Sequence, residues 1–202
     1  STIKLDGNFP TGTESVALGN STLASGSLSG GYSVAIGNQA LTSMTSGNDN
    51  TAVGRISMFS TTTGSGNTAV GQNSMQANTT GSYNTAVGGV ALDANTTASA
   101  NTALGYESLS ALTTGNSNVG IGYRALRADT LGDRNVAVGN EALSTQNFTS
   151  STDSYNVAVG YQAGKLLTTG TNNAFVGGQA GYSNTTGTCL LYTSPSPRDV
   201  EE

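Results

Sequence analysis

Few residues of this 202-residue chain have the types and spacing that support catalytic chemistry. Histidine is absent, so general acid–base catalysis would depend on carboxylates. The candidate carboxylates stand singly in the sequence, which favours a solvated surface over a paired catalytic site: Asp93, Glu107, Asp129, Asp133 and Glu141. We therefore expect a protein that is not an enzyme.

Metal and cofactor sites are not expected either. Glycine-rich rolls that bind calcium carry an aspartate in each repeat, and the repeats of this chain do not. The glycine pairs Gly88-Gly89 and Gly177-Gly178 are not followed by the Lys-Ser/Thr of a phosphate-binding loop. The one cysteine, Cys189, excludes an internal disulfide framework.

Three tyrosines are the candidate binding residues. Tyr106, Tyr123 and Tyr161 each follow a glycine of the repeat described below, and Asn140 takes this place in the coil between the last two. Because a repeat places equivalent positions in line, we expect the three phenol rings to form an outer stripe. Aromatic faces suit sugars, so the stripe predicts a glycan contact. The alternative is that the rings only pack against their neighbours on the surface.

Composition limits the classes of partner. Charged residues make up 9% of the chain and the formal net charge is −5. Nucleic acids and anionic membranes bind clustered Lys and Arg, so neither is expected as a partner. No apolar run approaches the length needed to cross a membrane. Abundant Gly, Ser, Thr and Asn are typical of disorder, but the apolar residues recur in strict register and predict a core formed by stacking.

The element that would position these residues is a repeat, clearest in Asn67-Thr68-Ala69-Val70-Gly71. Its last glycine, called the anchor glycine from here on, recurs in steps of 18, six of 17, then 21, then 17 residues: Gly19, Gly37, Gly54, Gly71, Gly88, Gly105, Gly122, Gly139, Gly160 and Gly177. A short fixed period is typical of a solenoid, in which each repeat forms one coil stacked on the last. We predict an all-β fold, a parallel β-solenoid (β-roll) of about ten 17-residue coils.

A short strand is expected just before each anchor glycine. The first and third residues before the glycine are large aliphatic or β-branched, as Val70 and Thr68 show, and we expect both to face into the coil. The residue between them is uniformly small, so we expect it to face outward against a neighbouring chain. This hypothesis predicts a homotrimer with an interface at Ala52, Ala69, Ala86, Ala103, Ala137, Ala158 and the exception Phe175.

The rest of each coil contains a corner and a turn. A second apolar position lies four residues after most anchor glycines: Leu23, Leu41, Met58, Met75, Leu92, Leu109, Leu126 and Leu143. Runs such as Tyr106-Glu107-Ser108-Leu109 predict a short helical turn or corner. Runs such as Thr79-Thr80-Gly81 predict the turn that follows. The 21-residue step predicts a polar loop inserted around residues 148–154.

The sequence divides into three parts. Residues 1–14 predict a lead-in strand and turns, residues 15–188 hold the repeats, and the composition changes abruptly after Thr188. The run from Cys189 to Asp199 resembles the translated adapter of transposon-based sequencing libraries. We therefore expect residues 189–202 to be a non-native tail, the alternative being a Ser/Pro linker to a further domain.

The repeats resemble two known groups of proteins. Ser15-Val16-Ala17-Leu18-Gly19-Asn20-Ser21 and Ser33-Val34-Ala35-Ile36-Gly37-Asn38-Gln39-Ala40 resemble the head repeats of YadA-like trimeric autotransporter adhesins. That resemblance implies left-handed parallel β-rolls assembled as trimers. The Asn-Thr-Ala-Val-Gly repeats with Thr-Thr-Gly turns are similar to repeats in tail fibres and tail spikes of environmental bacteriophages. In those proteins an endosialidase-type chaperone domain commonly follows the shaft.

These resemblances imply a fibrous surface protein. The first hypothesis is a phage tail-fibre or tail-spike shaft or receptor-binding segment, part of a virion, that attaches to a glycan or protein receptor on the host. The alternative is the head of a bacterial adhesin at the cell surface. A third hypothesis is an ice- or crystal-binding solenoid, since turn threonines can align as a ladder: Thr62, Thr79, Thr96, Thr113 and Thr130.

Overall fold

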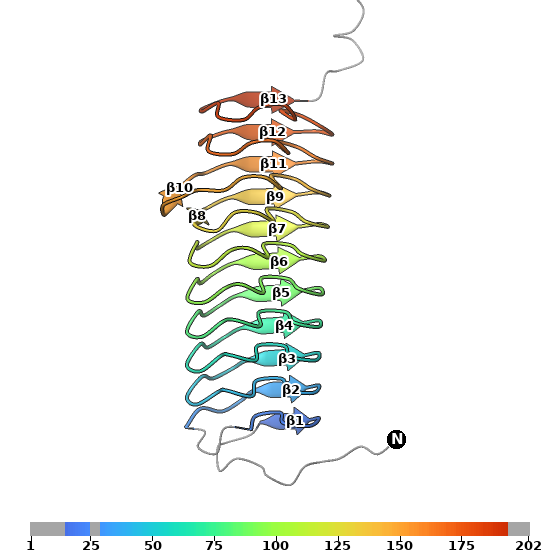
Figure 1. Cartoon of the computed structure of the whole chain (residues 1–202), viewed down its shortest axis with the longest axis vertical. Helices are drawn as coiled ribbons and strands as arrows, with labels where there is room; N and C mark the ends of the chain where they lie inside the picture. The colour runs from blue at the N-terminus through green and yellow to red at the C-terminus, as the bar shows by residue number, and fades with distance from the viewer. Residues whose placement is uncertain (1–14, 25–28, 194–202) are drawn as a thin grey trace, which may run out of the picture.

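The computed structural model describes residues 15–24 and 29–193, and in these ranges the chain is all-β with no helix. Eleven three-residue strands form one sheet: β1 (Val16–Leu18), β2 (Val34–Ile36), β3 (Thr51–Val53), β4 (Thr68–Val70), β5 (Thr85–Val87), β6 (Thr102–Leu104), β7 (Val119–Ile121), β9 (Val136–Val138), β11 (Val157–Val159), β12 (Ala174–Val176) and β13 (Leu191–Thr193). The coils stack along one axis as a rod, with β1 and β13 at opposite ends (Figure 1).

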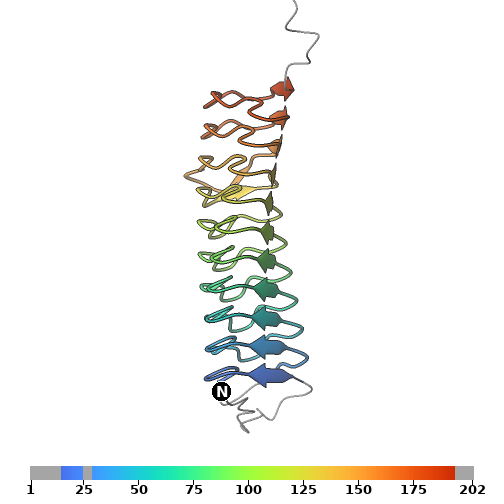
Figure 2. The same cartoon turned by 90° about the vertical axis from the view of Figure 1, so that its right-hand side faces the viewer.

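The large sheet joins equivalent residues of successive coils. Every neighbouring pair of its strands is parallel, and Ala69 of β4, for example, pairs with Ala86 of β5. The sheet forms one side of the rod and turns form the others (Figure 2). The predicted parallel β-solenoid of about ten coils is confirmed.

Of the two predictions for the residues after the anchor glycine, a short helical turn or a corner, the structure has a corner formed by a turn and no helix in the described residues. The backbone φ is 53° at Glu107 and 52° at Leu109. Left-handed residues at alternate positions cannot continue a right-handed helix. The corner instead bonds from coil to coil, since the Leu109 N–H donates to the Ala125 carbonyl at 3.0 Å.

The anchor glycine is required at this corner for two reasons. Gly71 has a φ of 138°, which L-residues with a side chain rarely adopt. A Cβ atom there would also lie 2.4 Å from the carbonyl oxygen of Gly88 in the next coil. Any larger residue would therefore force successive coils apart.

The interior of the coil holds the small residue of each strand together with the aliphatic residue four positions after the anchor glycine. The expected outward alanine face is therefore wrong, because this single chain completely buries Ala52, Ala69, Ala86, Ala103, Ala137, Ala158 and Phe175. Their small size does reflect close packing, but the opposing surface is the far wall of the same coil. Gly120 takes the alanine position in β7, and a Cβ there would lie 2.7 Å from Ser108 Oγ and 3.0 Å from Leu109 Cγ.

Phe175 fits inside because two neighbouring residues are small. Leu or Met stands four residues after the earlier anchor glycines, but Gly164 and Gly181 take this position in the last two coils. A Cβ at Gly164 would lie 2.6 Å from the Phe175 ring, and one at Gly181 would lie 2.2 Å from it. The ring occupies the volume that leucine side chains fill elsewhere.

A ladder of buried asparagines precedes the strands, at a position to which the sequence analysis assigned no role: Asn50, Asn67, Asn84, Asn101, Asn118, Asn135, Asn156 and Asn173. Asn84 shows the pattern, because its Nδ2 donates to Asn67 Oδ1 at 3.2 Å and to the Ala98 carbonyl at 2.8 Å. Its Oδ1 accepts from the backbone N–H of Asn101 at 3.0 Å and from Asn101 Nδ2 at 3.3 Å. The Asn84 amide therefore bonds to the coils on both sides.

The extra residues of the 21-residue step lie beside the rod. Strands β8 (Gly132–Asp133) and β10 (Thr152–Asp153) form a separate two-stranded parallel sheet there (Figure 1). After the last repeat, strand β13 pairs in parallel with β12 and continues the stack, although its residues fall in the predicted non-native tail. The origin of that tail stays a prediction, and the predicted lead-in strand at residues 1–14 lies outside the described residues.

Candidate binding surfaces

The carboxylates considered for catalysis are engaged by other groups of the chain. Glu107 accepts from Arg124 Nε at 2.7 Å, and Glu141 accepts from Lys165 Nζ at 2.7 Å. These hydrogen-bonded cations lower the pKa of Glu107 and of Glu141 from their ordinary values. Both carboxylates thus stay ionised in ion pairs at the surface, and burial raises the pKa of the separate carboxyl of Asp93.

The other two candidate carboxylates belong to the coils around the insertion. Asp129 is fully buried and accepts from the Gly132 N–H at 3.0 Å and from Gln146 Nε2 at 2.7 Å. Burial raises the pKa of Asp129 more than these donors lower it. Asp133 accepts from the Asn116 N–H at 2.6 Å. Within the described ranges, no group of three or more His, Cys, Asp or Glu is placed to hold a metal ion, and no helix is long and apolar enough to cross a membrane.

The residues that follow the anchor glycines form one line along the rod, which we call the corner column: Asn20, Asn38, Arg55, Gln72, Gly89, Tyr106, Tyr123, Asn140, Tyr161 and Gly178. Hydrogen bonds between coils hold it in register. The backbone carbonyls of Tyr106, Tyr123 and Asn140 each accept an N–H from the next coil, at 3.0, 2.8 and 2.8 Å.

Two of the three predicted tyrosines come together in this column. The rings of Tyr106 and Tyr123 stack with their centroids 6.0 Å apart and their planes inclined by 12°. The Arg124 guanidinium lies 4.8 Å from the centroid of the Tyr123 ring. A Cβ at Gly89 would lie 3.4 Å from Tyr106, so that ring also rests against the coil below. The faces that meet in this stack are not open to a sugar.

The third tyrosine stands apart from the stack. Asn140 occupies the corner column between Tyr123 and Tyr161, and both Asn140 and Tyr161 are exposed. Beyond Tyr161 the column continues with Gly178, where an added Cβ would meet no atom within 4 Å. The predicted stripe is thus a stacked pair, interrupted by Asn140, and a separate ring.

The second candidate surface is the outer side of the large sheet, which we call the outward face. One of its columns contains the first residue of each strand: Val16, Val34, Thr51, Thr68, Thr85, Thr102, Val119, Val136, Val157 and Ala174. The other contains the last residue: Leu18, Ile36, Val53, Val70, Val87, Leu104, Ile121, Val138, Val159 and Val176. All of these side chains are half-buried or exposed, and none is charged.

Sequence reasoning missed this surface because it placed both columns inside the coil. Strand alternation alone is symmetrical, since it separates two faces without saying which is interior. A usable signal was present at Phe175, where a large residue coincides with glycine at Gly164 and Gly181. A ring that needs such space must point into the coil.

The turn threonines do form a ladder, but their hydroxyl groups bond within the chain. Thr62 Oγ1 donates to the Thr79 carbonyl at 3.1 Å, and Thr79 Oγ1 donates to the Thr96 carbonyl at 2.9 Å. The same bond joins Thr96 to Thr113 at 3.2 Å and Thr113 to Thr130 at 3.0 Å. These hydroxyl groups therefore hold successive coils together.

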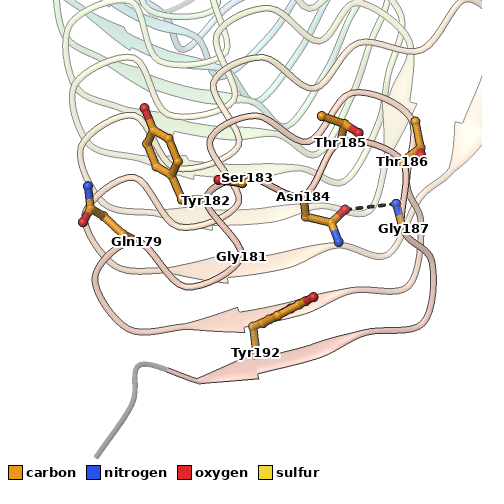
Figure 3. A pocket seen from close by; sticks show the side chains of 9 residues that line it. All are labelled: Gln179, Gly181, Tyr182, Ser183, Asn184, Thr185, Thr186, Gly187 and Tyr192. Atoms are coloured by element: carbon orange, nitrogen blue, oxygen red, sulfur yellow. Dashed lines mark hydrogen bonds between the residues drawn. The ribbon is translucent and has the colours of Figure 1, made fainter. Parts of the chain in front are cut away.

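A hollow lies at the C-terminal end of the described residues, between the turns of the last full coil and Tyr192 of β13 (Figure 3). Its side chains include Gln179, Tyr182 and Asn184, and the Asn184 Oδ1 accepts the Gly187 N–H at 3.0 Å. Among the described residues that line it, none carries a carboxylate, an amine or a thiol.

Comparison with family models, curated proteins and solved structures returned no match to this chain. The class of the protein therefore follows from its geometry alone. It is a parallel β-solenoid with one large sheet, whose interior amide ladder and outward apolar columns repeat with the coil. Its candidate sites are surfaces, the corner column and the outward face.

Proposed function

We propose that this chain is a non-enzymatic shaft segment of a bacteriophage tail fibre or tail spike, part of the virion, whose copies pack through the outward face and support attachment to a host surface. The outward face carries the proposal. It runs the length of the stack, two residues wide, with only Val, Ile, Leu, Thr and Ala side chains. A contiguous apolar surface of this extent is typical of an interaction site.

A second copy of the chain suits this face better than an unrelated partner. The columns repeat at the coil spacing, about 4.8 Å. Another copy lying parallel carries the same period, so every coil meets an equivalent coil with no accumulated mismatch. No charge on the face would be left buried without a partner.

The two columns favour a three-fold arrangement. Around a three-fold axis each copy touches two neighbours, so one column packs on each neighbour and the contact closes as a ring. Thr68 of one copy would then approach Val70 of another across the axis. This replaces the buried alanines with the outward face as the trimer interface.

The mass of the assembled protein tests the proposal. We expect light scattering to give three times the chain mass, and the double variant Val70→Asp/Val87→Asp to give a monomer because it buries unpaired carboxylates in the interface. Thr80→Asp, an exposed turn position in the neighbouring part of the chain, is the matched control and should remain trimeric. A monomeric wild type, or a trimeric Val70→Asp/Val87→Asp, would overturn the proposed assembly.

The adhesin alternative uses the same face. The head of a trimeric autotransporter adhesin would pack through the same columns, so assembly does not separate the two sources. The reading frame that adjoins the repeats does: a chaperone domain supports the phage protein, and a membrane-anchored β-barrel supports the adhesin.

One observation favours an ice-binding function as a second candidate. Thr51, Thr68, Thr85 and Thr102 stand in register on the outward face, with an aliphatic residue two positions after each. Thermal hysteresis and inhibition of ice recrystallisation by the wild-type protein would support this candidate. Their absence would exclude it.

A further inference from the structure

We infer that the outward face selects a second, parallel copy of this chain in coil register, through an ion pair between Asp49 of one copy and Arg55 of the next. This inference rests on the proposed assembly and names the residues that align its copies. The apolar columns alone do not fix the alignment, because neighbouring coils carry nearly the same residues and a shift by one coil leaves their contacts almost unchanged. Residues that differ from coil to coil must therefore set the register.

The outward face has an exposed column along each of its two edges. The corner column lies two residues after the end of each strand. The other edge, which we call the turn column, lies two residues before each strand and has left-handed backbone φ values from 48° to 67°. Its members are Tyr32, Asp49, Gly66, Tyr83, Ala100, Ser117, Arg134, Tyr155, Asn172 and Cys189. Every residue of both columns is exposed except Gly66 and Gly89, which are half-buried, so both edges are open to a neighbour.

One coil carries opposite charges on these two edges, and neither charge has an ionic partner in the chain. Asp49 and Arg55 lie on either side of β3 and are both exposed. Of the five cations in residues 15–24 and 29–193, four form ion pairs: Arg124 and Arg127 with Glu107, Arg134 with Asp153, and Lys165 with Glu141. Within the same ranges Arg55 and Asp49 form none.

A ring of parallel copies brings these two edges together. The strands run across the rod, so in such a ring the end of a strand in one copy meets the start of the equivalent strand in the next. Arg55 of each copy then faces Asp49 of its neighbour, and each junction gains one ion pair. Complementary charges at the rim of an interface add little affinity, but they fix register and disfavour other arrangements.

A shift by one coil removes this ion pair from every junction. Arg55 would face Tyr32 after a shift in one direction and Gly66 after a shift in the other. Both the cation and the carboxylate would then stand at the interface without a partner. The charges therefore distinguish alignments that the apolar columns cannot.

The tyrosines of the two edges fit the same register. In three successive coils a tyrosine on one edge is matched by a small residue on the other: Tyr83 with Gly89, Tyr106 with Ala100, and Tyr123 with Ser117. A shift by one coil in one direction would set the exposed Tyr83 against the exposed Tyr106. The coil of β11 differs, because Tyr155 and Tyr161 stand on its two edges and would meet as an aromatic pair between copies.

Paired cysteines in the full chain test the register. Asp49→Cys/Arg55→Cys places thiols on the two edges of one coil, and Cys189→Ser is included in every variant because Cys189 is exposed. The turn column accepts cysteine, since Cys189 itself takes that position with a φ of 61°. The matched control is Asp49→Cys/Asn20→Cys, whose thiols are two coils out of register. Two coil steps are about 9–10 Å along the rod, which is beyond the reach of a disulfide.

We expect mild oxidation to join Asp49→Cys/Arg55→Cys into a species of three chains in denaturing electrophoresis, whereas the control and both single-cysteine variants remain single chains. The inference is overturned if the double variant is trimeric but does not crosslink, or if the control or a single variant crosslinks as fully. Light scattering on the same samples separates the two proposals. A monomeric wild type overturns the proposed assembly together with this register, whereas a trimer without the crosslink overturns only the register.

Charge exchange tests the ion pair itself. Asp49→Arg and Arg55→Asp each set like charges against each other at every junction, so each should raise the concentration at which the trimer dissociates by at least about tenfold. The turn column accepts arginine, as Arg134 shows with a φ of 60°. Asp49→Arg/Arg55→Asp exchanges the two charges and should restore the dissociation of the wild type. Single variants that assemble like the wild type, or a double variant no better than either single one, would overturn the ion pair.

Discussion

Replacement of Asn84 by alanine should reveal how strongly the asparagine ladder holds the coils together. The Asn84 side chain makes four hydrogen bonds, two donated by Nδ2 and two accepted by Oδ1. It is fully buried, so water cannot replace them. At about 1 kcal/mol for each net hydrogen bond, Asn84→Ala should cost about 4 kcal/mol of unfolding free energy.

Urea denaturation followed by circular dichroism measures this loss at a fixed protein concentration, since assembly also contributes to stability. Because coils of a solenoid can open locally, amide exchange should show the lost protection centred on the coils of Asn67 to Asn101. Asn38→Ala is the matched control. Asn38 is exposed and donates one long contact of 3.5 Å, so its loss should stay within about 0.5 kcal/mol.

Asn84→Asp tests the same ladder through pH. The new carboxylate would face the Ala98 carbonyl and Asn67 Oδ1, which are acceptors, so the folded protein should raise its pKa above the unfolded value of about 3.9. The penalty is then smallest below about pH 4 and grows as pH rises toward the folded pKa. Equal denaturation midpoints for Asn84→Ala and Asn38→Ala, with no pH effect in Asn84→Asp, would refute the ladder as a source of stability.

Three further predictions concern the interior and the corners. Gly71→Ala should lower the unfolding free energy by more than about 3 kcal/mol, because backbone strain adds to an overlap with the next coil. Gly178→Ala should leave the unfolding free energy unchanged, since its Cβ would meet no atom within 4 Å, and thermal melts compare the two variants. Phe175→Ala should cost about 3–5 kcal/mol, and Gly181→Leu should recover part of this by filling the same volume; a double-mutant cycle that shows simple additivity would contradict this. Burial raises the pKa of the Asp129 carboxyl, so its contribution to stability is fully present below about pH 4 and is lost as pH rises through the folded pKa. The difference in unfolding free energy between the wild type and Asp129→Asn should therefore shrink from pH 4 to 8, as measured by urea titrations.

The repeat period made the overall architecture predictable from sequence. Equal spacing of the anchor glycines determines that equivalent residues stack, and the structure pairs them in register along the sheet. It also placed the aliphatic position after the glycine correctly, as the complete burial of Met75 and Leu92 shows. Such inferences depend only on the identity of successive coils.

The direction of the strand side chains could not be read from the period. Val70 was expected inside and Ala69 outside, and the reverse is true. A 17-residue coil is narrow and its interior already holds the Leu or Met that follows the anchor glycine. The strand residue that points inward therefore has space for a methyl group but not for a second large aliphatic side chain. The backbone conformation of the corner could not be predicted for a related reason, because the side-chain types of residues such as Glu107 do not indicate alternating left-handed φ values.

The division between interior and exterior also explains how this chain can vary its outer residues on a uniform scaffold. The buried columns hold nearly the same residue in every coil because each must match the coil above and below it. The corner column bears no such constraint on its side chains, and it changes from Arg55 to Gly89 to Tyr106 along the rod. The residue types of a solenoid of this kind can therefore vary along one outer column. A single interruption, such as Asn140 between two tyrosines, is enough to separate Tyr161 from the stacked pair.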